Sequence, residues 1–112
     1  MLGYSATVYQ VAPGVGDAKF DRIREVPYRQ VTTYFQTLAA ETLADVPYRT
    51  WVDHLLKASE EGRARMLHGG GYPFLFHAQG RDIKNDFAAS GVEAIADLDD
   101  EKWYLVEAWD QS

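Results

Sequence analysis

The chain has 112 residues, of which 46% are hydrophobic and 13% aromatic, a composition that favours one folded domain over residues 1–112 rather than a disordered segment. It has no cysteine, which excludes disulfides, thiolate zinc sites and cysteine nucleophiles. The net charge is −6, and residues 86–112 hold eight acidic residues but one basic residue. Because a negative surface repels phosphate backbones, we expect no nucleic-acid binding and instead a protein partner with a basic surface, or self-association.

The sequence predicts no membrane span, because it has no stretch of about 18 apolar residues. Residues 1–10 also lack the basic and apolar regions that characterise a secretory signal. We therefore expect a soluble, cytoplasmic protein.

The first quarter of the chain predicts a strand followed by a short helix. Residues 4–11 are rich in β-branched and aromatic side chains and end at a Pro-Gly pair, as strands often do. Asp17 is a plausible N-cap for a helix over 18–25. The Gly-Val-Gly at 14–16 lacks the third glycine of a phosphate-binding loop, because Lys19 stands in that place, so we predict no phosphate site there.

A short repeat marks the next segment: Val-Pro-Tyr-Arg occurs at 26–29 and again at 46–49. Each copy precedes an apolar run with helical spacing, and proline is tolerated in the first turn of a helix. The repeat therefore predicts helices near 27–43 and 47–61, the second of which could run on to Leu67. Two copies are too few for a solenoid.

The second half of the chain predicts a strand over 72–79, a helix over 82–90 and a hairpin. The hairpin strands are expected at 92–98 and 103–109, joined by the acidic loop 99–102. The last strand carries apolar residues on both faces, which favours a central place in the sheet.

This order of elements (strand, three helices, strand, helix, hairpin) predicts the α+β class. We expect a mostly antiparallel sheet of about four strands with helices packed on one face.

The densest candidate for a ligand site is the His-Gly-Gly-Gly-Tyr segment at 68–72. Consecutive glycines allow backbone N–H groups to converge on an anion, and His68 could serve as an acid or a base. The string matches part of a lipase oxyanion hole, but no Gly-x-Ser-x-Gly elbow is present, so we reject a serine hydrolase. The alternative to a site is a flexible turn between two elements. A pocket here would be formed by His68, Gly69, Gly70, Gly71, Tyr72, His77 and Arg81.

Neither metals nor cofactors are predicted. The three histidines, His54, His68 and His77, have no spacing that would bring two of them to one zinc ion on a helix or a strand. The acidic loop 99–102 lacks the Asp-x-Asp-x-Asp-Gly pattern of a calcium loop.

The leading hypothesis is a small acidic interaction module, without enzymatic activity, that binds a protein partner as an inhibitor, an immunity protein or an adaptor does. Charge complementarity and aromatic anchors make the C-terminal segment the expected contact surface. The residues we expect at this surface are Asp99, Asp100, Glu101, Trp103 and Trp109. The alternative is a small-ligand-binding domain or minor enzyme with its pocket at 68–72. A structural subunit of a larger assembly is a third hypothesis that the sequence is compatible with.

Overall fold

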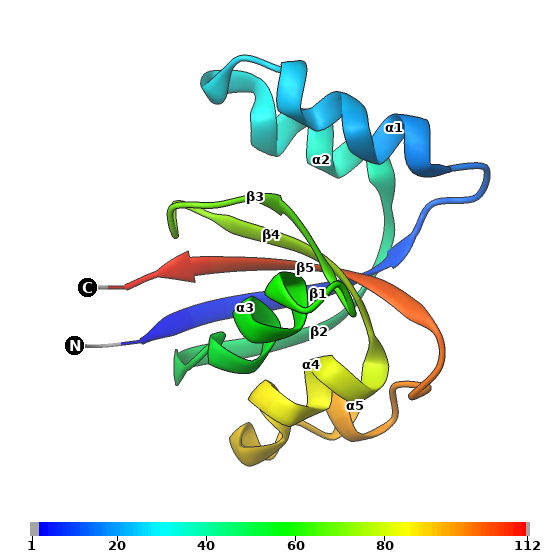
Figure 1. Ribbon diagram of the computed structural model, residues 1–112. Helices are drawn as coiled ribbons and strands as arrows, with labels where there is room; N and C mark the ends of the chain where they lie inside the picture. The colour runs from blue at the N-terminus through cyan, green and yellow to red at the C-terminus, as the bar shows by residue number, and fades with distance from the viewer. Residues whose placement is uncertain (1–2, 112) are drawn as a thin grey trace.

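The computed structural model describes residues 3–111, apart from the side chain of Tyr48. Its centre is a five-stranded antiparallel sheet in the order β2-β1-β5-β4-β3 (Figure 1). The strands are β1 (Tyr4–Val11), β2 (Ala39–Thr50), β3 (Arg65–His68), β4 (Phe74–Gln79) and β5 (Trp103–Asp110).

Helices cover both faces of this sheet (Figure 1). One layer contains α1 (Asp17–Arg22), α2 (Val31–Leu38) and the short 3₁₀ turns η1 (Ile23–Glu25) and η2 (Tyr28–Gln30). The other contains α3 (Asp53–Glu60), α4 (Gly80–Phe87), η3 (Ala88–Ser90) and α5 (Glu93–Ala96).

Two hydrophobic cores follow from the alternation of side chains along the strands. On β5, Val106 points into the core under α3, α4 and α5, whereas Leu105 points into the core under α1 and α2. Both side chains are fully buried. The central strand is therefore apolar on both faces, as a strand between two helix layers must be.

The α+β class and the antiparallel sheet are confirmed, and so is the central position of the last strand. The sheet has five strands rather than about four, and its helices lie on two faces rather than one. The second helix layer is what the two apolar faces of β5 require, because each must be covered.

The helices predicted from the Val-Pro-Tyr-Arg repeat are only partly present. The first shrinks to η2 and α2, which end at Leu38, and the second to α3, which ends at Glu60. Between them lies β2, which pairs with β1 and holds the whole second copy of the repeat. Its side chains alternate, with Ala44 and Val46 buried and Asp45 and Pro47 exposed.

The two copies differ because their tertiary surroundings differ. Pro27 precedes η2, as a proline at a helix start is expected to do. Pro47 lies in β2, an edge strand, where the missing N–H of proline costs no hydrogen bond if it faces away from the sheet.

The predicted hairpin strand over 92–98 is wrong. This segment contains α5, in which Ile95 is buried, and Leu98 follows as the next buried side chain. The apparent alternation came from small alanines, which are strong helix formers. Strand β3 was also missed, because its four residues are too few to show a period.

No helix among residues 3–111 is both long enough and apolar enough to cross a membrane.

Candidate functional site

The residues predicted to bind a partner do not form one surface. Trp103 and Trp109 lie at opposite ends of β5, where they pair with Gln79 and Ser5. Both rings are partly exposed, at 40% and 38%. Asp99, Asp100 and Glu101 lie in the turn beside Trp103, so the turn and Trp109 are separated by the length of the strand.

The acidic turn is fixed to the start of α4. The backbone N–H of Gly80 donates to the Lys102 carbonyl at 3.0 Å, and that of Arg81 donates to the Asp100 carbonyl at 3.2 Å. Gly80 also packs directly against the Asp99 carbonyl, where a Cβ atom would overlap it. The turn therefore packs against the start of α4 and does not project from the fold as the tip of a hairpin.

Two of its three carboxylates already face cations. Lys84 Nζ lies 2.8 Å from Asp100 Oδ1, and Arg81 Nη2 lies 3.9 Å from Glu101 Oε1. The hydrogen bond from Lys84 lowers the pKa of Asp100 below its usual value. These contacts reduce the charge that the turn offers to a basic partner.

The glycine segment forms a tight loop between β3 and β4. Gly70 and Gly71 have φ angles of 101° and 89°, a region that residues with a Cβ atom rarely adopt. The loop brings Tyr72 back beside His68, so two of the predicted ligand-binding residues do meet at one cavity.

We call this cavity the aromatic cleft and define it by Tyr28, His68, Tyr72 and Trp109, with Arg29 also lining it. Its volume is about 310 Å³. The three large rings come from η2, the glycine loop and the end of β5, and they are 66%, 50% and 38% exposed. Several large aromatic side chains exposed to solvent around one cavity are typical of a surface that binds a protein or a ligand.

Two hydrogen bonds fix the cleft. The Tyr28 hydroxyl donates to the Tyr72 carbonyl at 2.9 Å, which ties the helical layer to the loop. His68 Nδ1 lies 2.9 Å from the Pro73 carbonyl oxygen, which can only accept, so Nδ1 is the donor. In the neutral ring Nε2 is then left as an acceptor. The centroids of the His68 and Tyr28 rings are 5.6 Å apart.

His77 and Arg81 do not belong to the cleft. His77 lies between the rings of Phe20 and Trp103, with centroid distances of 4.3 and 4.8 Å. Burial, and secondly the nearby Arg65, lower the pKa of His77 to about 4. Arg81 faces the acidic turn from α4.

The cleft instead includes residues that sequence reasoning did not assign to it, namely Tyr28, Arg29 and, from the other predicted surface, Trp109. Tyr28 and Arg29 belong to the first copy of the repeat. An aromatic residue and an arginine at the start of a helical segment were the available signal, but nothing in the sequence linked them to His68.

A second polar cluster joins α3 to α4. Asp82 is buried and accepts hydrogen bonds from His54 Nε2 at 2.9 Å and from Arg63 Nη1 at 2.6 Å. Asp86 accepts the backbone N–H groups of His54 and Leu55 at 3.0 and 2.8 Å, which caps α3 from the neighbouring helix. These groups satisfy one another, so the cluster serves to hold the helices together.

Among residues 3–111, no three His, Asp or Glu side chains are grouped so that they could hold a metal ion. Comparison of the chain with protein-family models, curated proteins and solved structures finds no match.

Proposed function

We propose that this protein is a non-catalytic interaction module, of the inhibitor or adaptor type, that binds a protein partner through the aromatic cleft. The observation that carries the proposal is the convergence of Tyr28, Tyr72 and Trp109 from three separate segments around one open cavity. Tyrosine, tryptophan and arginine are the side chains most enriched at the energetic centres of protein interfaces. Arg29, which also lines the cleft, is the arginine of this site.

The net charge of −6 supports a partner with a basic surface. Opposite net charges speed the encounter of two proteins, and this steering acts over the whole surface rather than through one contact. We therefore assign the long-range attraction to the protein as a whole and the short-range contact to the cleft.

Affinity capture from a lysate of the native host, with wild-type protein and single variants as bait, tests this proposal. We expect one protein to be retained by the wild type and lost with Trp109→Ala. Trp51→Ala is the matched control, because Trp51 is 40% exposed and does not line the cleft. Equal retention by the wild type and Trp109→Ala would contradict the proposal.

Glu101→Lys tests the acidic turn separately. Its side chain is 85% exposed, so the charge can be reversed without disturbing the core. If the turn contributes only to the overall charge, the variant should weaken capture mainly at low salt, where surface charges are least screened. Complete loss at both low and high salt would assign a direct contact to the turn instead.

A small anionic ligand is the second candidate for the cleft. Its volume of about 310 Å³ is at the lower end of small-molecule pockets. Arg29 can bind a carboxylate or phosphate, and the surrounding rings can stack on a planar group. Thermal-shift screening with aromatic carboxylates and phosphates tests this candidate, and a stabilisation that disappears in Arg29→Gln would support it.

A further inference from the structure

Strand β3 leaves one side of the sheet open. It stands last in the strand order and pairs with β4 alone, so no other strand among residues 3–111 lies along its outer edge. An edge strand presents unpaired N–H and C=O groups that can accept a strand from another chain.

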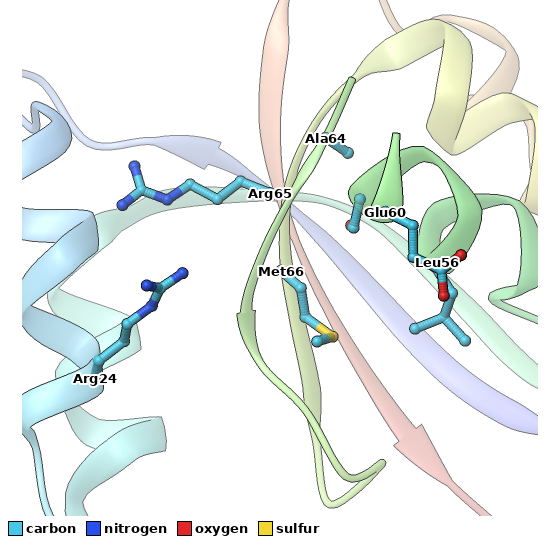
Figure 2. A pocket seen from close by; sticks show the side chains of 7 residues that line it. Arg24, Leu56, Glu60, Ala64, Arg65 and Met66 are labelled. Carbon is cyan, nitrogen blue, oxygen red and sulfur yellow. The ribbon is translucent and has the colours of Figure 1, made fainter. Parts of the chain in front are cut away.

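A trough of about 330 Å³ runs along this edge. Figure 2 shows Arg24 and Arg65 on one side of β3 and Leu56 and Glu60 on the other. Met66 is 39% exposed and lies over the strand, where it helps to line the trough. The trough is therefore cationic towards η1, whereas towards α3 it combines the apolar Leu56 with the hydroxyl of Ser59 and the carboxylate of Glu60.

The two arginines differ in their partners. Arg65 pairs with Asp21 and lies 3.8 Å from Asp17, both of which are exposed carboxylates on α1. Among the described residues, no carboxylate lies within ion-pair distance of Arg24. The Arg24 guanidinium can therefore form an ion pair with a carboxylate of another molecule without first breaking an ion pair within this chain.

We propose that an extended segment of a protein partner adds to β3 as a further antiparallel or parallel strand, with acidic and apolar residues in alternation. Side chains of a strand point alternately to the two faces of a sheet. Every second residue of the segment would therefore face Arg24 and Arg65, and the residues between them would face Leu56 and Met66. This surface is distinct from the aromatic cleft and does not depend on it.

A second copy of this chain fits the edge less well than an acidic segment. Two-fold pairing of β3 with itself would place Arg24 and Arg65 of both copies on the same face of the combined sheet. The two Arg24 guanidinium groups, neither of which is paired with a carboxylate of the described residues, would then lie on one face, and like charges near each other oppose association.

The test uses a capped synthetic peptide of about eight residues that alternates glutamate with valine, a length sufficient to cover the edge. We expect it to bind the full chain, measured by heteronuclear NMR shifts that centre on residues 64–67. Arg24→Glu should weaken binding by about tenfold, the effect of losing roughly 1.4 kcal/mol. Lys19→Glu, which makes the same charge change on exposed α1 outside the trough, should leave binding within about twofold of the wild type.

Backbone methylation separates strand addition from simple charge attraction. The N–H groups of successive residues in a strand point to opposite edges, so methylating all valine nitrogens blocks one edge and methylating all glutamate nitrogens blocks the other. If the glutamate side chains face Arg24 and Arg65, a bound peptide can pair with β3 through only one of its two edges. We therefore expect one of the two methylated peptides to bind and the other not to bind. Any other pattern, or absence of binding by the parent peptide at about 1 mM, the weak end of specific affinity, would overturn the proposal.

The two proposals can fail independently. Trp109→Ala alters the aromatic cleft but not the trough, so it should leave peptide binding unchanged. Arg24→Glu alters the trough but not the cleft.

Discussion

The hydroxyl of Tyr9 donates a hydrogen bond of 2.9 Å to the carboxylate of Glu107, and both side chains are buried. They come from adjacent strands, β1 and β5, and meet beneath α2, from which Gln36 donates to the Tyr9 oxygen at 3.4 Å. Burial raises the pKa of Tyr9, so the hydroxyl stays protonated and remains a donor. A carboxylate on the central strand is tolerated because it has this partner.

Tyr9→Phe should therefore lower the free energy of unfolding by about 1–3 kcal/mol, because Glu107 is left in the core without its tyrosine donor. Urea unfolding at neutral pH measures the loss. Tyr34→Phe is the control, since its hydroxyl bonds to the Lys19 carbonyl at an exposed position that water can reach. The double variant Tyr9→Phe, Glu107→Leu should lose less than the two single variants together, and strict additivity would contradict the pairing.

Gly80→Ala should destabilise the fold more than a glycine-to-alanine change usually does. A Cβ atom at residue 80 would overlap the Asp99 carbonyl oxygen, which is backbone and cannot move aside cheaply. We expect a loss of about 1–3 kcal/mol, the usual range for overpacking. Gly16→Ala is the matched control, because Gly16 has a negative φ and open space where its Cβ would lie. Similar stability of the two variants would mean that the turn is not docked on α4 in solution.

The sequence was sufficient to predict elements whose side-chain pattern is set locally. Strand β1 matches its predicted range of 4–11, and the two apolar faces of β5 correctly indicate its central position. The sequence pattern was insufficient to predict β2, because Ala44 and Val46 become strand residues only through pairing with β1, which lies more than thirty residues earlier. Tertiary pairing of this kind overrides a helix-start pattern such as the one at Pro47.

In the candidate site, too, residues close in sequence were predicted together, whereas residues joined only by tertiary packing were not. His68 and Tyr72 are close in sequence and were predicted together, and the structure does bring them to one cavity. Tyr28 and Trp109 join them only because η2 and the end of β5 pack against the same loop. His77 was assigned to the site by its nearness in sequence, but the pleat and length of β4 carry it to the ring of Phe20 instead.

Asp82→Asn should weaken the attachment of α3 to α4. The Asp82 carboxylate is buried and bonds to both His54 and Arg63, so an amide in its place removes a charge and replaces one acceptor oxygen with a donor. We expect a loss of about 1–3 kcal/mol in the free energy of unfolding. Glu61→Gln is the control, because Glu61 is an exposed partner of the same arginine and should change stability little. An unchanged unfolding midpoint in Asp82→Asn would show that the cluster adds nothing to the fold.

His77 makes the stability of the protein depend on pH below neutrality. Its pKa falls from 6.5 to about 4 because the folded protein buries the ring, so the unfolded chain binds the proton more readily. Stability that is fully present above about pH 6.5 is therefore lost as the pH falls towards 4. His77→Phe keeps a ring between Phe20 and Trp103 but cannot titrate. Between a pH of about 7.5 and a pH of about 5, the wild type should lose about 2 kcal/mol more than this variant, since the carboxylates titrate in both. Urea unfolding at the two pH values measures the difference, and parallel losses would mean that His77 is protonated as easily in the fold as outside it.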